Sequence, residues 1–268
     1  MRFVDVTLAR RLETAEAESA AECARVLAAR RPESGAAVEA VAGGYAIFAG
    51  VNSPATQAVA LGLNGRVSET EVERLEEFYR SRGDGVRVEL CPLADVSLVE
   101  LFGRRGYRVT EFSNVLIRAL ERNESWPPAA PRVRVEQVGE QDAALWVRIV
   151  SEGFAEQFPV TPEILEAMEL FSCNPAATCF LGRIDGEPVG GGALSMRDGV
   201  AGLFGASTLP AFRNRGVHTA LMQARLARAA AAGCELALTI TRPGSTSQRN
   251  AERQGFGVVY TRVKFARE

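Results

Sequence analysis

The same order of local patterns occurs in each half of this 268-residue chain. In the first half, an alternating strand pattern at residues 86–92 ends in a proline, and a helical stretch leads to the Gly-Tyr pair at 106–107 and another strand. In the second half, a strand pattern at 234–240 is followed by a proline, a helical stretch, the Gly-Phe pair at 255–256 and a last strand. Glycine suits a left-handed helix terminus, and the aromatic residue after it can pack the helix end against a sheet.

The match between the two halves extends upstream. An apolar strand pattern at residues 57–63 precedes a helix at 69–81, and one at 200–205 precedes a helix at 218–232. We interpret this match as a diverged internal duplication. The plainer alternative is that any two α/β domains share such an order of elements.

A proline-rich segment divides the chain near its middle. Three prolines lie within residues 127–131, and proline fixes φ and has no N–H, so neither a helix nor a central strand can continue through them. The expected domains are residues 1–122 and 132–268, joined by a linker at 123–131.

Composition narrows the class of protein. Hydrophobic residues make up 47% and charged residues 24%, as is ordinary for a globular protein with a core. The net charge of −2 gives no basic field for nucleic acid or anionic lipid. Five scattered cysteines and one histidine do not make a zinc framework, so no metal is expected. The absence of a signal-peptide pattern or a membrane-spanning run, together with reduced thiols, favours a cytoplasmic location.

Residues 132–268 predict the element order β-α-α-β-β-β-α-β-α-β. The expected strands are residues 133–138, 178–184, 189–195, 200–207, 236–241 and 258–265. The expected helices are residues 140–151, 162–171, 217–232 and 246–254. Asp-Gly sequences at 185–186 and 198–199 predict hairpin turns. The glycine triplet at 190–192 lies within a strand pattern and predicts a bulge or a kink rather than a phosphate loop.

The residues between 208 and 221 carry the clearest chemistry. They connect an apolar strand to an amphipathic helix, whose first amides have no intrahelical acceptor and form the positive end of the helix dipole. Gly216 lets a ligand approach the backbone, and Arg213 and Arg215 add charge, so the segment predicts a phosphate receptor. Solvated loop cations are the plainer reading of the two arginines. Neither a Walker nor a G-x-G-x-x-G sequence occurs, which disfavours ordinary ATPases and Rossmann proteins.

The pattern Arg-x-x-Gly-x-x that starts at Arg213 follows a strand and Pro210 and opens a helix. It resembles the pyrophosphate-binding motif of the GNAT superfamily of acyl-CoA-dependent N-acyltransferases, and the element order of residues 132–268 is similar to theirs. The resemblance implies an α/β (α+β) fold of two tandem GNAT-like domains, each a mixed, mostly antiparallel central sheet flanked by helices. The motif lies in the second half, so the first domain would be degenerate.

By position, the resemblance implies how acetyl-CoA, or another acyl-CoA, binds as cosubstrate. The implied CoA-binding residues are Ser207, Thr208, Leu209, Arg213, Asn214, Arg215, Gly216, Val217, His218, Thr219, Ala220 and Asn250. Residues 207–209 would splay from 236–240 and pair with the pantetheine arm. The amine would attack the thioester carbonyl directly, with backbone N–H groups stabilising the oxyanion. Phe154 and Phe158 would wall the acceptor site, although their spacing also fits a core.

The sequence departs from the family pattern around the chemistry. His218 stands where the motif usually has glycine or alanine; it can crowd the pyrophosphate, donate to it, or simply pack, and the helix dipole is expected to keep it neutral. Ala251 stands where family members often place a tyrosine as general acid, so Ser247, Asn250 and Tyr260 are the candidate substitutes. The strand before the motif holds no carboxylate, and Glu152 is the candidate general base.

The matching loop of the first half, residues 64–71, has a different character. Ser68 is a good N-cap with Glu71 at the capping-box position, and the carboxylates of Glu69 and Glu71 repel pyrophosphate. We expect this half to keep the fold, to bind no CoA, and to pack against the second half so that it shapes the acceptor pocket.

The sequence therefore predicts an N-acyltransferase that moves an acetyl or other acyl group from CoA to a primary amine, expected to belong to a small molecule. A non-catalytic acyl-CoA sensor or interaction module is the alternative, motivated by Ala251 and the missing base. A transferase acting on protein N-termini or lysines is a third hypothesis. No nucleic acid or membrane is expected as a partner, and a homodimer is left open. The acceptor's identity depends on loops that follow no transferable code.

Overall fold

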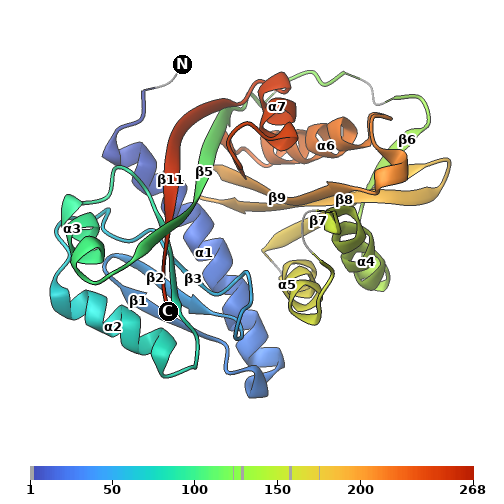
Figure 1. The fold of residues 1–268 in the computed structure, drawn as a ribbon. Helices are drawn as coiled ribbons and strands as arrows, with labels where there is room; N and C mark the ends of the chain where they lie inside the picture. Colours follow the sequence, from blue (N-terminus) through green and yellow to red (C-terminus); the bar gives the residue numbers. More distant parts are fainter. Residues whose placement is uncertain (1–2, 123, 128–129, 157–158, 175) are drawn as a thin grey trace. The chain divides into compact units, whose positions relative to one another are not determined.

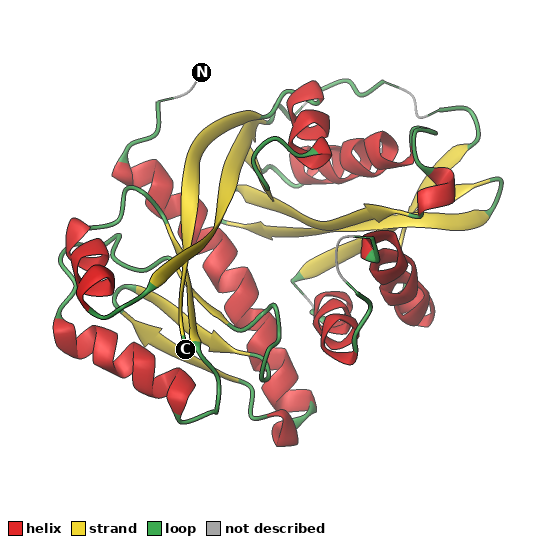
Figure 2. Ribbon diagram, viewed as in Figure 1, coloured by secondary structure: helices red, strands yellow, loops and turns green. Residues whose placement is uncertain are grey.

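A computed structural model describes residues 3–268 except 123, 128–129, 157–158 and 175, and the chain forms two compact units (Figures 1 and 2). Unit 1 comprises Met1–Leu116, Ile240–Arg249 and Gly257–Glu268, and unit 2 comprises Ile117–Thr239 and Asn250–Phe256. The chain changes unit within strand β5 (Arg108–Ala119), within strand β10 (Leu236–Thr241), and within and just after helix α7 (Thr246–Arg253).

These units are not two contiguous segments, in contrast to the expected domains. The first change, at Leu116, precedes the expected linker, part of which lies outside the described residues. The last strand, β11 (Gly257–Arg267), belongs to unit 1, where it pairs antiparallel with β4 (Val86–Leu90). The segment 132–268 therefore gives its final strand to the sheet of unit 1, because strand pairing depends on distant partners that a local pattern does not reveal.

Unit 1 is built on a sheet with the strand order β1-β2-β3-β4-β11-β5. Its remaining strands are β1 (Ala37–Val41), β2 (Gly44–Phe48) and β3 (Gln57–Val59), and its helices are α1 (Val6–Arg30), the 3-10 turn η1 (Pro32–Ser34), α2 (Glu69–Arg80) and α3 (Val96–Arg104). Val88 and Leu90 of β4 join the apolar core under α2 and α3. Glu89 alternates with them and points to the opposite face, where Arg262 of β11 connects it to Glu13 of α1.

Local signals explain most of these elements. The predicted helix at 69–81 is confirmed as α2, and Ser68 and Glu71 form the predicted capping box. The strand predicted at 57–63 is shorter than expected: β3 ends at Val59 because Ala60 and Gly62 adopt left-handed backbone, at φ 59° and 71°. Helix α1 and the hairpin of β1 and β2 were not among the predicted elements.

Unit 2 has the strand order β10-β9-β8-β7-β6 and includes the end of β5. Its remaining strands are β6 (Val133–Gln137), β7 (Ala177–Ile184), β8 (Glu187–Arg197) and β9 (Val200–Thr208). Its helices are α4 (Ala143–Phe154), α5 (Pro162–Cys173) and α6 (Val217–Ala231), with 3-10 turns η2 (Glu140–Asp142) and η3 (Pro210–Phe212). The strands and helices predicted for this half are confirmed to within a few residues, except that the first turn of the helix expected at 140–151 is 3-10 and α4 continues to Phe154.

The glycine triplet of β8 lets helices approach both faces of this sheet. A Cβ at Gly191 would collide with Val150 and Trp146 of α4, whereas one at Gly192 would lie 2.9 Å from the guanidinium carbon of Arg225 on α6. Neighbouring strand residues point to opposite faces, so α4 and α6 cover opposite faces of the sheet.

The two halves end alike, as the repeated pattern predicted. Gly106 and Gly255 adopt left-handed backbone at φ 78° and 83°. The amide after each glycine donates to a carbonyl five residues earlier, Tyr107 to Phe102 at 3.0 Å and Phe256 to Ala251 at 3.2 Å. Such bonds close a helix C-terminus in a Schellman motif. In each unit the strand before this helix is parallel to its predecessor, β4 to β3 and β10 to β9.

Two further features concern the whole described chain. Cys23, Cys91, Cys179 and Cys234 are buried thiols that form no disulfide. Within the described residues, none of the helices combines the length and the apolar character needed to cross a membrane.

Candidate functional site

A sharp turn connects β9 to α6. Asn214 and Gly216 adopt left-handed backbone at φ 61° and 83°, which reverses the chain between strand and helix. The Leu209 amide donates to Val189 O at 2.9 Å and fixes the beginning of the turn, and buried Val217 fixes its end. Glycine is required at 216, because a Cβ there would be strained by the positive φ and would lie 3.2 Å from the Ala130 side chain.

Helix α6 begins without a side-chain cap. Its N-cap is Gly216, and its first backbone hydrogen bond runs from Ala220 N to Gly216 O at 3.0 Å. The amides of residues 217–219 therefore have no acceptor within the helix. Helix α2 differs, because there Ser68 and Glu71 cap each other's amides. The uncapped amides and the positive end of the dipole suit an anionic ligand such as a phosphate group.

The two arginines of the turn have different surroundings. The Arg213 guanidinium donates to Gly153 O at 3.2 Å and pairs with Glu156, so it ties the turn to the C-terminal end of α4. Arg215 is exposed and lies over the Phe212 ring, 5.2 Å from its centre. Both place positive charge beside the uncapped helix, but Arg213 also braces the turn.

Strand β9 carries a bulge ahead of the turn. Its parallel register with β10 runs from Val200–Leu236 to Leu203–Thr239. Its register with β8 shifts between Gly191 and Ala193, opposite Gly205, which has a φ of 57°. The irregularity expected at the glycine triplet is therefore present, but its extra residue lies in β9, opposite Gly192.

Two hydroxyl groups at the end of β9 differ in their hydrogen bonding. Ser207 Oγ donates to Val150 O of α4 at 2.9 Å and joins the strand end to that helix. The Oγ1 atom of Thr208 is buried and has no hydrogen-bond partner among the described residues. A buried polar group without a partner costs free energy, so this site suits a ligand that supplies one.

Arg225, on the α6 face that packs on the sheet, supports the bulge. Its side chain is 1% exposed and donates to Leu221 O at 3.0 Å, Ala193 O at 3.1 Å and Phe204 O at 3.3 Å. Burial lowers the pKa of Arg225 to about 10, so it stays charged near neutral pH. Sequence reasoning missed this residue, although a cation four positions after the buried Leu221 of an amphipathic helix is a visible signal.

His218 is half-buried in the first turn of α6. Burial, and to a smaller extent the charge of Arg225, lower the pKa of His218 to about 4. The imidazole is therefore neutral near neutral pH, as expected, but burial is the main cause where the sequence suggested the helix dipole.

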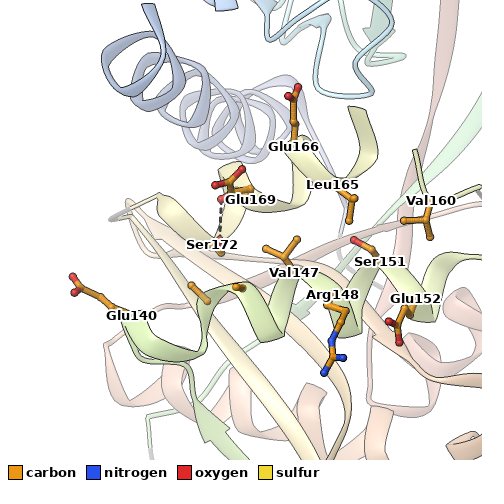
Figure 3. A pocket seen from close by; sticks show the side chains of 12 residues that line it. Glu140, Val147, Arg148, Ser151, Glu152, Val160, Leu165, Glu166, Glu169 and Ser172 are labelled. Atoms are coloured by element: carbon orange, nitrogen blue, oxygen red, sulfur yellow. Dashed lines mark hydrogen bonds between the residues drawn. The ribbon is translucent and has the colours of Figure 1, made fainter. Parts of the chain in front are cut away.

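A groove of about 690 Å³ runs between α4 and α5 (Figure 3). Glu152, the candidate base, is exposed at the end of α4 and lines this groove together with Val160. Phe154 instead packs, partly buried, against the core around Trp146, which favours its structural reading. Phe158 lies outside the described residues.

The remaining candidates lie on α7 and β11. Ser247 is exposed in the part of α7 that belongs to unit 1, and Asn250 is half-buried in the part that belongs to unit 2. Tyr260 lies in the core of unit 1, where its hydroxyl donates to Glu13 Oε1 at 2.7 Å. Burial, and then the charge of Glu13, raise the pKa of Tyr260. This placement gives no support to Tyr260 as the general acid, since its proton is held by a buried carboxylate.

Comparison with known proteins shows what these features are similar to. Residues 143–256 match the model of the Acetyltransferase (GNAT) family. The chain is similar to a GCN5-related N-acetyltransferase from Kribbella flavida, with 19% identity and a TM-score of 0.64 over 91% of this chain and 95% of the other. It is also similar to a tandem GNAT protein from the clavulanic acid biosynthesis pathway, with 15% identity and a TM-score of 0.62 over 98% and 94% of the two chains. No curated protein matches the chain.

The family model matches one part of the chain, whereas the structural similarity covers nearly all of it. The family model spans α4 to Phe256, which includes the bulge of β9, the turn and the start of α6. The structural similarity spans nearly the whole chain and confirms the expected fold, two tandem GNAT-like units with mixed, mostly antiparallel sheets flanked by helices.

Proposed function

We propose that this chain, whose residues 143–256 match the GNAT acetyltransferase family, transfers an acyl group from CoA to the primary amine of a small molecule in unit 2. One observation carries the proposal. Over one short stretch, the chain combines a left-handed Gly216, an uncapped α6 and a buried Thr208 hydroxyl that has no partner among the described residues. A diphosphate at the helix and an amide-rich pantetheine arm along the strand supply what these groups lack.

The donor would bind along the strand end and the turn. The pyrophosphate would accept from the backbone amides of residues 217–219, with the charge of Arg215 beside it. Arg213 would hold the turn in position through Gly153 and Glu156. The pantetheine arm would pair with the backbone of 207–209, beyond the point where the β10 register ends.

The chemistry would be a direct transfer. The amine nitrogen attacks the thioester carbonyl carbon, the carbon–sulfur bond breaks, and CoA leaves as a thiolate. The amine loses one proton, for which Glu152 is the candidate acceptor, and the thiolate takes up one proton. A free thiol has a pKa near 8.5, so the thiolate is a fair leaving group and can be protonated by water. Turnover is therefore compatible with alanine at position 251.

Unit 1 would not bind a second CoA. Its corresponding loop is closed by the protein's own groups: the capping box of Ser68 and Glu71 satisfies the helix end, and Val67 N donates to Ser97 Oγ at 2.9 Å. The part expected of this unit in shaping the acceptor pocket stays a prediction.

The closed helix end of unit 1 suggests the test. Thr219 is the third helical residue of α6, as Glu71 is of α2. Thr219→Glu should cap α6 without destabilising it and should repel pyrophosphate. We expect calorimetry to show at least tenfold weaker acetyl-CoA binding, since one lost anion contact of about 1.4 kcal/mol has that effect. Thr219→Gln is the neutral control and should bind almost normally. Equal affinities for Thr219→Glu and the wild type, or no binding by the wild type, would exclude the proposal.

Ala251 is buried, with 1% of its surface exposed, and it favours a second candidate function. A chain without the usual acid could bind acyl-CoA as a sensor and turn nothing over. The release of free thiol from acetyl-CoA in a broad screen of amines separates the two. Thiol release with any amine excludes the sensor, whereas tight binding with no release supports it.

A further inference from the structure

Helix α6 buries the guanidinium of Arg225 against backbone carbonyls. The side chain is 1% exposed, and within the described parts of the chain it donates to carbonyl oxygens but forms no ion pair with an acidic side chain. Burial is the cause of its lowered pKa, about 10. Carbonyl groups are dipoles without net charge, so the groups that accept from this side chain do not neutralise it.

Arg262 of unit 1 shows what a buried arginine with a structural role requires. It is also 1% exposed, and it pairs with Glu13, Glu16 and Glu89. A buried charge is costly unless it is paired, so the chain surrounds this cation with carboxylates. The contrast suggests a different role for Arg225, because a buried cation held by neutral groups favours negative charge that forms near it during a reaction.

Arg225 lies where the β8–β9 ladder is interrupted. Its Nη1 donates to Ala193 O at 3.1 Å and to Phe204 O at 3.3 Å, and these two residues are partners at the point where the register shifts. A Cβ at Gly192 would lie 2.9 Å from the guanidinium carbon, so the glycine leaves room for it. The side chain therefore joins β8 to β9 beside the bulge.

Trp146 of α4 covers the opposite face of the bulge. Its Nε1 donates to Phe180 O at 3.2 Å, and a Cβ at Gly191 would lie 2.9 Å from that nitrogen. A Cβ at Gly205 would lie 3.6 Å from the indole ring. The bulge is held between an indole and a guanidinium, which fixes the direction in which β9 continues.

The thioester end of the donor would lie close to this bulge. In the proposed binding mode, the pyrophosphate is at the start of α6 and the pantetheine arm runs back along residues 209 to 207, so its acyl end points towards Gly205. The charge of Arg225 also reaches the start of α6, since it contributes to the lowered pKa of His218. During transfer, negative charge forms first on the thioester oxygen and then on the sulfur, at this end of the arm.

We propose that Arg225 is a positioning residue for acyl transfer: it holds the β9 bulge, and its charge favours the negative charge of the transition state and of the departing CoA thiolate. This inference rests on the proposed function. The bonds that form and break are unchanged, since nitrogen replaces sulfur at the carbonyl carbon and water protonates the thiolate. The cation stabilises the thiolate before that proton arrives, and so supplies part of what a general acid at position 251 would supply.

The thiol of bound CoA reports this charge without an acceptor amine. A thiolate absorbs ultraviolet light more strongly than a thiol, so the absorbance of the full chain with CoA, followed against pH, gives the pKa of the bound thiol. The complex with desulfo-CoA, which lacks the sulfur, is the baseline. We expect the bound thiol to titrate about one pKa unit below free CoA, because a nearby cation favours the thiolate. Arg225→Gln keeps an amide donor without the charge and should raise this pKa again.

Arg228→Gln is the matched control. Arg228 is an exposed arginine of the same helix, so solvent screens its charge and the variant should leave the thiol pKa unchanged. The single imidazole resonance tests the free protein: Arg225→Gln should raise the pKa of His218 above about 4, and Arg228→Gln should not. Arg225→Met is a second neutral variant if the glutamine variant does not fold.

The possible results separate this inference from the proposed function. An equal pKa of the bound thiol in the wild type and in Arg225→Gln overturns the inference and leaves the proposed function standing. Folded neutral variants that bind no CoA also overturn it, because they show a structural role alone. If the wild type binds no CoA, both the proposed function and the inference fail.

Discussion

The residue His218 illustrates how surroundings decide a side chain's chemistry. Its place in the first turn of α6 suggested a contact with pyrophosphate. In the structure the imidazole is half-buried and its pKa is lowered to about 4, mainly by burial and then by Arg225. A neutral imidazole adds no charge to an anion site, so the backbone amides and the arginines remain the proposed phosphate receptor.

The lowered pKa of His218 gives a pH prediction. The unfolded chain binds a proton near pH 6.5 and the folded chain only near pH 4, so stability is complete above 6.5 and falls as the pH drops towards 4. Between pH 7 and pH 5 the loss should be at most about 2 kcal/mol, and His218→Gln should remove it. Urea unfolding at the two pH values measures the difference between the two proteins.

The chain offers a direct check of the same residue, because His218 is its only histidine. A single imidazole resonance should titrate in the NMR spectrum with a pKa near 4. An ordinary value of about 6.5, or an equal pH dependence in His218→Gln, would contradict this assignment.

Among single residues, those with local partners were predictable and those with distant partners were not. Ser68 and Glu71 form their capping box within four residues, so the sequence contained the whole interaction. Arg225 was missed because what matters is its surroundings: three carbonyls from different elements accept from it.

At the scale of elements, the C-terminal end of helix α3 offers a matched pair of glycines. Gly103 lies exposed in its last turn, and Gly106 follows the helix with a φ of 78°. A Cβ at either position meets no atom within 4 Å, so only the backbone conformation distinguishes them. Gly103→Ala should stabilise the protein by roughly 0.5–1 kcal/mol, and Gly106→Ala should destabilise it by about 1 kcal/mol. Equal midpoints of urea unfolding for the two variants would show that the helix end is not closed as described.

The elements themselves were predicted well where a turn residue marks each end. Asp185 and Gly186, and Asp198 and Gly199, have positive φ at the two predicted hairpins of unit 2. β3 was predicted too long because Ala60 carries no sign of its left-handed φ of 59°. A non-glycine residue in that conformation is held by tertiary contacts, which the local sequence does not show.

At the scale of the whole chain, the least predictable feature is the unit to which β11 belongs. The repeated pattern gave each half a final strand and suggested that each strand stays in its own half. In the structure β11 pairs with β4, from Val263–Leu90 to Arg267–Val86. The alternation of apolar residues fixes which face of β11 is buried but not which strand lies beside it. The sequence did contain one sign of this pairing. Arg262 is a cation within a strand pattern, and a buried cation needs carboxylates beside it.

Because β11 comes from the second half of the chain but pairs in unit 1, we expect that the two halves of the chain cannot be separated. Arg262 is 1% exposed in unit 1 and donates to Glu13 at 2.8 Å and Glu89 at 3.0 Å, and it also pairs with Glu16. The segment 1–122 lacks β11, so β4 would become an edge and these carboxylates would lose their cation. Removing one partner of a buried ion pair costs about 3–5 kcal/mol, a large part of a domain's stability.

We therefore expect the segment 1–122 to show no cooperative urea transition by circular dichroism, and to gain one when mixed with the segment 123–268. A mixture made with Arg262→Met in the second segment should not recover, because the strand would then return without the charge that three carboxylates require. Arg267→Met in the same strand is the matched control. Arg267 is a partly exposed side chain that pairs with Glu76, and Glu76 keeps its pair with Arg105 when Arg267 is replaced, so this mixture should recover. A cooperative transition of 1–122 alone would show that β11 is dispensable and that the contiguous domains are the folding units after all.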